Sequence, residues 1–347
     1  MIGESEAQKL TIGGNGHSFT TNSLGINSGP NAKRLALSRW YAAMNSGVNF
    51  SASAGSTGIA FDGANIWVAC DDQDGTNNST VTVHQAHNGE QVCDPIDMDD
   101  QLSVQKCIGP VALAYDGRYM WCACKDNDVV AKISASQYII KGANLPTGQE
   151  PVFIEFTGDR MWISNNVGDS ITVYNATPPD YDLDYTLTNV SAPYGMASDG
   201  VNMWVASDGS NDVTVFNLAT PDNEETPPTT YDVGAYSKDI EFDGANMWIS
   251  HFDNDSISIL RASDGTLVKQ LTSEDGVGDE PTFMVFDGIY LWVSNETDGT
   301  LSVFRVNDFA HVTDVNANGA NSSPQQLAFD GAHVWSANSE TGTISKR

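Results

Sequence analysis

The chain has 347 residues, of which 45 are Asp or Glu and only 16 are Lys or Arg, so its formal net charge is −29. Such a surplus of negative charge repels phosphate groups, which argues against nucleic acid as a partner and against adhesion to an anionic membrane surface. No run approaches eighteen consecutive apolar residues, so we also expect no membrane insertion.

The first residues lack the basic start and apolar run of a secretory signal, so we expect synthesis in the cytoplasm without a signal peptide. Residues 1–47 form an extension that differs in charge from the rest of the chain. Residues 1–50 carry a formal charge of +2, and the remaining residues carry −31. Residues 1–30 are rich in Gly, Ser, Thr and Asn and too poor in apolar residues to fold alone.

A short amphipathic helix is predicted within this extension, over residues 32–46. Four apolar residues recur there at the spacing i, i+3, i+4 and i+7, namely Leu37, Trp40, Tyr41 and Met44. The helix either packs on the domain that follows or anchors the chain to other structural proteins of a larger assembly. The charge contrast with the rest of the chain favours the anchor.

Seven tryptophans mark an internal repeat in the remainder of the chain. They lie 41 to 44 residues apart after a first spacing of 54, and they are Trp67, Trp121, Trp162, Trp204, Trp248, Trp292 and Trp335. Gly stands four residues before every one of them, Asp stands five residues before six of them, and Phe or Tyr stands six residues before six of them. Ala or Ser always stands two residues after the tryptophan.

The pattern around each tryptophan predicts four strands per repeat. In the first repeat, residues 59–61 form a short apolar strand, Asp62 and Gly63 form a tight turn with positive φ, and residues 65–69 form a strand that is apolar on both faces. A polar turn, an alternating third strand and a weaker fourth strand complete the unit. Four antiparallel strands in roughly 43 residues describe one blade of a β-propeller. A solenoid is the alternative, but solenoid repeats usually contain a helix or shorter coils.

The predicted fold is therefore all-β: a seven-bladed β-propeller of four-stranded antiparallel blades over residues 48–347, preceded by the short extension with its one helix. The seventh repeat ends after its third strand, which would leave a sheet edge uncovered. Residues 48–54 alternate in polarity and precede the first blade, so we expect them to supply the closing strand.

The repeats resemble a known group of propellers. The segments Phe-Asp-Gly-Ala-Asn-Ile-Trp-Val-Ala at 61–69, Phe-Asp-Gly-Ala-Asn-Met-Trp-Ile-Ser at 242–250 and Arg-Ala-Ser-Asp-Gly-Thr-Leu at 261–267 are similar to the YVTN/YncE-type seven-bladed propeller repeats, the group to which virginiamycin B lyase is also similar. The resemblance to the lyase implies a catalytic histidine with acidic metal ligands. The six histidines fall at unrelated points of the repeat, so no such motif matches and no catalytic residue is carried over.

The turn between the second and third strands is acidic in every repeat. These turns would lie on one face of the propeller and concentrate negative charge there, although Asp also favours hairpin turns for backbone reasons. The candidate binding residues are Asp71, Asp72, Asp74, Asp126, Asp128, Asp169, Asp208, Asp212, Asp253, Asp255, Glu296 and Asp298. They predict contact with a cationic or metal-bridged partner.

Calcium is the one cofactor that these turns suggest. The run Asp253-Asn254-Asp255 offers hard oxygen donors, but no twelve-residue calcium loop is present in the sequence. We otherwise expect no cofactor.

The five cysteines, an odd number in a large chain, argue against a disulfide framework. Cys93 and Cys107 flank the insertion that lengthens the first repeat, so a disulfide between them is one expectation and two free thiols are the other. Cys70 and Cys124 occupy equivalent positions in adjacent blades, and we expect both to be small buried residues.

Without an enzyme signature, the sequence favours a non-catalytic recognition, display or structural module. We expect a virion or injection-particle component, in the tail or on the surface of a phage, anchored by residues 1–47. Its partner outside the particle would be a host-surface receptor or glycan. The alternatives are an intracellular scaffold and a lyase-like or hydrolase-like propeller enzyme.

Overall fold

The computed structural model describes residues 47–71, 79–99, 106–178, 181–221, 227–234, 236–319 and 321–347. The chain divides into two units, Met1–Ser46 and Gly47–Arg347, and the second holds all the described residues. Several predicted features lie outside the described residues: the helix over 32–46 with Leu37, Trp40, Tyr41 and Met44, and the turn residues Asp72 and Asp74.

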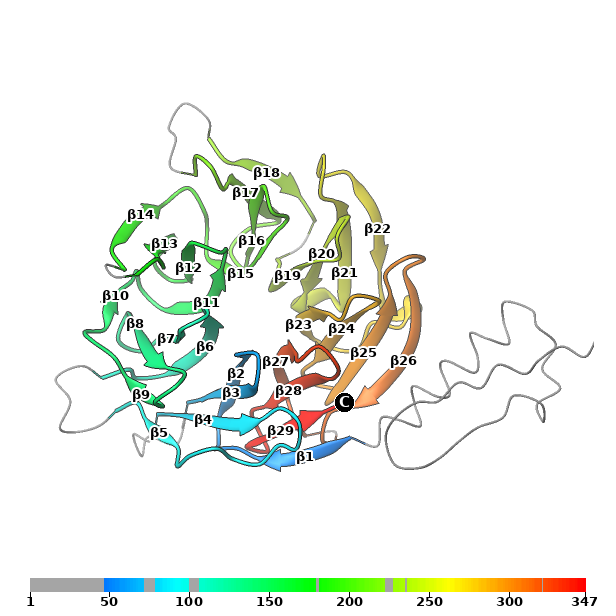
Figure 1. Cartoon of the computed structure of the whole chain (residues 1–347). Helices are drawn as coiled ribbons and strands as arrows, with labels where there is room; N and C mark the ends of the chain where they lie inside the picture. The colour runs from blue at the N-terminus through cyan, green and yellow to red at the C-terminus, as the bar shows by residue number, and fades with distance from the viewer. Residues whose placement is uncertain are drawn as a thin grey trace, which may run out of the picture. The chain divides into compact units, whose positions relative to one another are not determined.

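Seven antiparallel sheets make up the described part of Gly47–Arg347 and surround a common axis (Figure 1). The first strands of successive sheets contact one another in turn. The first strand of the seventh sheet contacts the first strand of the first sheet, which closes the ring. The fold is thus a seven-bladed β-propeller of four-stranded blades, as predicted, except that two short segments, β9 (Ile139–Ile140) and β10 (Leu145–Pro146), share the outer position of the second blade.

The strands follow the repeat. The first three blades contain β2 (Ser56–Phe61), β3 (Asn65–Cys70), β4 (Thr80–Gln85) and β5 (Ile96–Asp97); β6 (Pro110–Tyr115), β7 (Tyr119–Cys124), β8 (Val129–Ser134), β9 (Ile139–Ile140) and β10 (Leu145–Pro146); and β11 (Pro151–Phe156), β12 (Arg160–Asn165), β13 (Ser170–Asn175) and β14 (Leu183–Leu187). The next three contain β15 (Pro193–Ser198), β16 (Asn202–Ser207), β17 (Asp212–Asn217) and β18 (Thr229–Asp232); β19 (Asp239–Phe242), β20 (Asn246–His251), β21 (Ser256–Arg261) and β22 (Leu267–Leu271); and β23 (Pro281–Phe286), β24 (Tyr290–Asn295), β25 (Thr300–Arg305) and β26 (Ala310–Asn316). The seventh contains β27 (Pro324–Phe329), β28 (Val334–Asn338), β29 (Thr343–Lys346) and β1 (Val48–Ser51).

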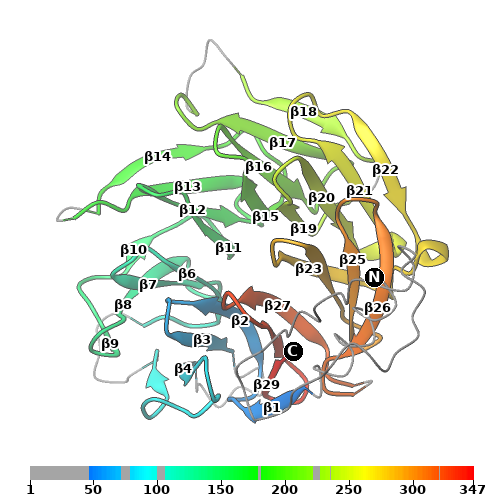
Figure 2. The ribbon, with the colours of Figure 1, turned by 45° about the vertical axis from the view of Figure 1, so that its right-hand side comes forward.

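The outer strand of the seventh blade, β1, comes from the other end of the propeller chain. It pairs antiparallel with β29, with Val48 opposite Lys346 and Ser51 opposite Thr343. Figure 2 shows the two strands side by side, β1 in blue and β29 in red. This is the closing position expected for residues 48–54, and the strand uses the first four of them.

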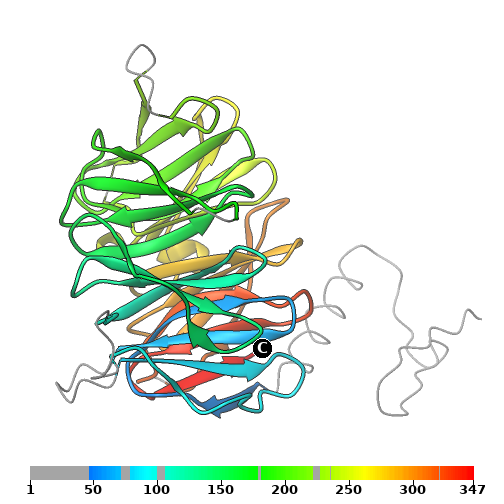
Figure 3. The ribbon, with the colours of Figure 1, turned by 60° about the vertical axis from the view of Figure 1, so that its left-hand side comes forward.

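Polar contacts also join the seventh blade to the first. Lys346 Nζ donates to the carbonyl oxygen of Ala86 at 2.6 Å, and the backbone N–H of Ile59 donates to Gln326 Oε1 at 3.2 Å. In the side view of Figure 3 the blue strands of the first blade and the red strands of the last blade lie together. Strand pairing and these bonds hold the two ends of the propeller in one ring.

The core consists of layers between neighbouring blades, and each repeat tryptophan is at most 1% exposed. A buried indole N–H requires an acceptor. In six blades the acceptor is the Asp five residues earlier. Asp243 Oδ2, for example, accepts from Trp248 Nε1 at 2.8 Å, while its Oδ1 accepts from two backbone N–H groups of the turn. The third blade uses Thr157, whose Oγ1 accepts from Trp162 Nε1 at 3.0 Å.

The outer strands depart from the repeat in the first two blades. In the first, β5 has two residues, and an isolated bridge joins His84 to Gln91. In the second, β9 and β10 both pair with β8. An outermost strand packs against one neighbour only, so fewer contacts constrain its length.

Neither expectation for Cys93 and Cys107 is met, because the two are not bonded to each other and only Cys93 is a free thiol. Cys107 is bonded to Cys124, with the Cα atoms 5.1 Å apart, and Cys93 is free. The backbone explains the pairing, because the N–H of Lys125 donates to Gly109 O and so holds the segment after Cys107 beside the end of β7. Cys124 is therefore not the simple buried thiol that its repeat position predicted.

Candidate functional site

The turns between second and third strands fall on one face of the ring, because the blades share one strand order with the first strand at the axis. We call this the acidic face. Its predicted residues within the described part of the chain are Asp71, Asp126, Asp128, Asp169, Asp208, Asp212, Asp253, Asp255, Glu296 and Asp298.

Three aspartates of the acidic face join neighbouring blades. Asp128, Asp169 and Asp255 have positive φ, and the Oδ1 atom of each accepts from a backbone N–H at the start of the next blade. The donors each precede a first-strand proline, and they are Glu150 at 2.9 Å, Ala192 at 2.7 Å and Glu280 at 2.9 Å. These carboxylates have a structural role that accounts for part of the acidity of the turns.

Two further aspartates form ion pairs with lysines near the axis. Asp71 is 6% exposed and its carboxylate lies 2.8 Å from Lys125 Nζ, while Asp208 lies 3.3 Å from Lys238 Nζ. Lys238 Nζ also lies 3.9 Å from the ring centroid of Tyr194. The charge of both aspartates is therefore compensated within the chain.

The remaining predicted carboxylates differ in exposure. Asp212 and Glu296 each accept a hydrogen bond from a serine hydroxyl. Asp126, Asp253 and Asp298 are exposed. The structure thus leaves only part of the predicted set open to a partner.

Asp279 belongs to the acidic face but was not among the predicted residues, since it lies in the connection before β23. It is exposed, and the charges of Asp298 and Asp255 raise its pKa. Crowded carboxylates of this kind attract cations.

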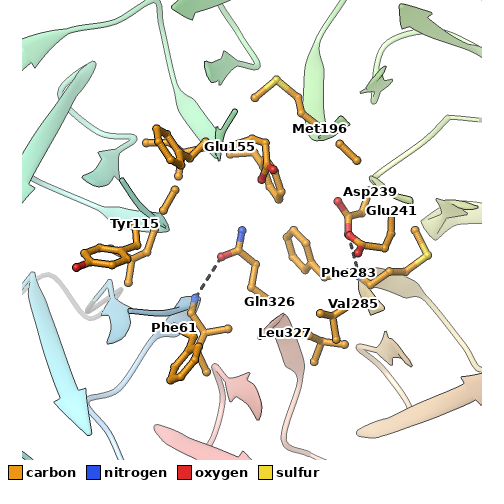
Figure 4. A pocket seen from close by; sticks show the side chains of 18 residues that line it. Phe61, Tyr115, Glu155, Met196, Asp239, Glu241, Phe283, Val285, Gln326 and Leu327 are labelled. Carbon is orange, nitrogen blue, oxygen red and sulfur yellow. Dashed lines mark hydrogen bonds between the residues drawn. The ribbon is translucent and has the colours of Figure 1, made fainter. Parts of the chain in front are cut away.

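A second candidate site, a cavity of about 360 Å³, lies on the axis (Figure 4). The first strands of all seven blades line it. Its aromatic lining includes Phe61, Phe153 and Phe283, and Figure 4 shows the side-chain amide of Gln326 pointing into it. The described residues that line the cavity include no Lys, Arg or His.

Three carboxyl groups enter this cavity from two blades. Glu155 lies on β11, and Asp239 and Glu241 lie two residues apart on the same side of β19. Asp239 Oδ2 accepts from the backbone N–H of Met284 at 2.8 Å, and Glu241 Oε1 accepts from that of Phe286 at 3.2 Å. No hydrogen bond joins the three carboxyl groups to one another among the described contacts.

Burial dominates the titration of these groups. It raises the pKa of Glu155 to about 8, with a further contribution from the charge of Asp239, and it raises the pKa of Asp239 to about 7. Burial and the charges of Asp239 and Glu155 raise the pKa of Glu241 well above its ordinary value. The three groups therefore affect one another, and an added cation would favour their ionised forms.

These three residues were not among the predicted site residues, although the repeat contains a signal for two of them. The position seven residues before each tryptophan is small or apolar in five blades, namely Ala60, Ala114, Ala197, Val285 and Ala328. Glu155 and Glu241 occupy that position in the other two. An acidic residue at a position that is otherwise Ala or Val, on a strand next to the axis, indicates a role other than packing.

Lyase-like chemistry would require a histidine, and the histidines in the described ranges lie away from the cavity. His84 and His251 are buried with both ring nitrogens hydrogen-bonded, and burial lowers the pKa of each. His87 is exposed, and His311 and His333 lie beside aspartates. None of them lines the cavity.

No helix within the described residues is long and apolar enough to cross a membrane. No protein-family model and no curated protein matches the chain.

Solved structures resemble it throughout the propeller. Virginiamycin B lyase from Staphylococcus aureus has a TM-score of 0.68 and 17% identity, over 86% of this chain and 98% of the lyase. Hydrazine synthase of Kuenenia stuttgartiensis has a TM-score of 0.68 and 15% identity, over 85% and 96%. The Cps50 (Swd1) β-propeller domain of Myceliophteria thermophila has a TM-score of 0.67 and 12% identity, over 86% and 99%. At these identities the likeness concerns the fold, and this chain is a seven-bladed β-propeller like that of virginiamycin B lyase.

Proposed function

We propose that this propeller is a non-catalytic recognition module that presents its acidic face to a cationic or metal-bridged partner. The main observation behind the proposal is a set of exposed carboxylates for which no hydrogen bond or ion pair is found among the described residues: Asp126, Asp253 and Asp279. Asp298 is exposed as well, but its Oδ2 accepts from the backbone N–H of Asp279 at 2.9 Å. They lie on turns and connections of a rigid ring, where recognition residues commonly occur. Their mutual repulsion would fall when a positively charged surface binds.

The finer proposal is that the chain belongs to a virion or comparable particle. Residues 1–47, whose charge contrasts with that of the propeller, would bind other structural proteins of the particle. The acidic face would then remain open to a host-surface receptor or glycan. Co-purification of the full chain with assembled particles supports this setting, and its absence from purified particles contradicts it.

Charge reversal tests the acidic face. The triple variant Asp126→Lys, Asp253→Lys, Asp279→Lys avoids the carboxylates that hold blades together. A control with the same change of charge reverses Asp159, Asp264 and Asp308, which lie on turns of the opposite face and are each paired with an arginine. We expect the first variant, and not the second, to lose salt-sensitive binding to host-cell envelopes.

Two results would overturn the proposal. Equal binding by both triple variants would mean that the acidic face makes no contact. Metal-dependent turnover of a lactone or glycan by the wild-type protein would contradict the non-catalytic role.

A further inference from the structure

We propose that the central cavity is a binding site for a small organic cation with primary ammonium groups, and that Glu155, Asp239 and Glu241 provide its counter-charges. This inference concerns the axis of the propeller and does not depend on the function proposed for the acidic face.

The charge of the cavity lining favours a cation. Three carboxyl groups enter the cavity, and the described residues that line it include no basic side chain. Ionised groups buried without a partner are costly, so a folded chain normally pairs them or keeps them protonated. A cation bound in the cavity would compensate the negative charge of all three carboxylates.

One carboxylate oxygen of the cavity lacks a hydrogen-bond partner. Asp239 is 3% exposed, and its Oδ1 atom has no hydrogen-bond partner among the described residues. The neighbouring blade leaves space for this carboxylate by placing Gly195 beside it, where a Cβ atom would lie 2.2 Å from Oδ1. A buried acceptor without a donor is uncommon in folded proteins, and an ammonium N–H would satisfy it.

The spacing of the carboxylates favours an organic cation over a metal ion. Within the described chain, the one group of three His, Cys, Asp or Glu side chains whose ligand atoms lie within 4.8 Å of one another is Cys107, Cys122 and Cys124, and two of these, Cys107 and Cys124, are joined in a disulfide. The cavity carboxylates do not converge that closely, so they do not form the compact oxygen shell that Mg²⁺ or Ca²⁺ requires.

The lining supports an organic ligand. Phe61, Phe153 and Phe283 offer aromatic faces and edges, which suit both methylene groups and ammonium ions. A volume of about 360 Å³ is at the lower end of small-molecule sites and accommodates a short aliphatic amine. Carboxylates on β11 and β19, on either side of the fourth blade, favour a ligand with two ammonium groups.

Isothermal titration of the full chain with 1,4-diaminobutane tests the site. We expect saturable binding, weakened at least about tenfold in the double variant Glu155→Gln, Glu241→Gln, which keeps the side-chain size and removes two charges. The matched control Glu90→Gln, Glu340→Gln removes the same charge from exposed positions and should bind as wild type does. Tetramethylammonium has no N–H donor, and we expect it to bind much more weakly.

Thermal melting keeps the result interpretable, because Gln has the size of Glu and is neutral at every pH, so the cavity variant should be at least as stable as wild type. The inference is overturned if wild type shows no saturable binding of the diamine at millimolar concentration, or if the cavity variant binds it equally well. Equal binding of tetramethylammonium would overturn the role of hydrogen bonding. Mg²⁺ or Ca²⁺ binding that disappears in the cavity variant, without diamine binding, would replace the organic cation by a metal.

Discussion

At the scale of single residues, the Asp of the Asp-Gly turn, which is present in six of the seven blades, has two roles. Its carboxylate orders the turn and also accepts the indole N–H of a tryptophan in the core. The spacing of five residues thus follows from hydrogen bonding as well as from turn preference. Thr157 accepts the indole N–H, but no turn N–H donates to its side chain among the described bonds.

The substitution Asp243→Ala should therefore lower the free energy of unfolding by about 3 kcal/mol, because it leaves the buried Trp248 N–H and two turn N–H groups without their acceptor. Chemical denaturation followed by tryptophan fluorescence measures the change. Asp264→Ala removes a carboxylate from an exposed turn and should cost much less. The reverse change in the third blade, Thr157→Asp, should stabilise the protein. Equal losses of unfolding free energy for Asp243→Ala and Asp264→Ala would contradict the role of the indole acceptor.

The cavity carboxyls predict a pH dependence of stability. Their pKa values in the folded chain, about 8 for Glu155 and about 7 for Asp239, exceed the values near 4 of an unfolded chain. The folded state then holds protons that the unfolded state has released, so the free energy of unfolding falls as pH rises from about 4 to about 8. Buried His84 and His251, with lowered pKa values, act in the opposite direction below about pH 6.5.

We therefore expect the melting temperature to decline between about pH 6.5 and pH 8 and to level off above that range. The double variant Glu155→Gln, Glu241→Gln should show a smaller decline, because Gln does not titrate. A wild-type melting temperature that rises through this interval would show that the carboxyls are already ionised at neutral pH.

At the scale of elements, β1 determines whether the ring is closed. Phe50 stacks on Trp335 and also covers Gly89 of the first blade, where an added Cβ atom would lie 2.1 Å from the Phe50 ring. One side chain of the closing strand therefore packs against both the seventh and the first blade. Arg347 adds a bond from Nη2 to Asn49 Oδ1 at 3.0 Å.

The substitution Phe50→Ala should cost about 2 kcal/mol, less than for a fully buried phenylalanine because this ring is half-buried. Val48→Ala on the same strand is the matched control, since Val48 is 52% exposed and should change stability by about 0.5 kcal/mol or less. Urea denaturation of both variants provides the comparison. Losses of similar size would mean that β1 contributes backbone pairing and no packing.

The sequence predicted the inner strands well because each blade repeats the same arrangement of strands, turn and buried tryptophan. The tryptophan spacing located seven blades, and the missing last strand pointed to residues 48–54 as its replacement, of which Val48–Ser51 form the strand. The outer strands β5, β9 and β10 could not be located in this way, since each lacks a neighbour on one side. The bond between Cys107 and Cys124 depends on a contact between a connecting segment and β7, which sequence spacing does not reveal.

The candidate sites were predictable to different degrees. The acidic turns were visible in the sequence, but their division into blade contacts, ion pairs and exposed carboxylates depends on geometry. Glu155 and Glu241 could be detected by extending the repeat comparison to the position seven residues before the tryptophan. Asp239 could not, because that position in other blades holds residues as different as Gly58, Phe153 and Gln326.

At the scale of the whole molecule, the net charge of −29 dominates the electrostatics, and most of the carboxylates that produce it belong to the propeller. Self-repulsion of this size opposes the compact state and is screened by salt. This repulsion acts at the exposed Asp279, because the charges of Asp298 and Asp255 raise its pKa. The same repulsion would make the acidic face attractive to a cationic surface.

Raising the salt concentration should therefore raise the melting temperature, most steeply at low ionic strength, where the Debye length is about 30 Å at 0.01 M. Asp279→Asn should raise the melting temperature at low salt by relieving Asp298 and Asp255, and the gain should fade at about 0.5 M salt because the repulsion is then screened. Glu90→Asn changes the net charge equally, and it should have the smaller effect if crowding of carboxylates matters beyond net charge. Calorimetry over a salt series separates the two contributions. If the gain in melting temperature from Asp279→Asn persists unchanged at high salt, it arises from backbone conformation and not from charge repulsion. Repulsion between carboxylates would then give no reason for the acidic face to bind a cationic partner.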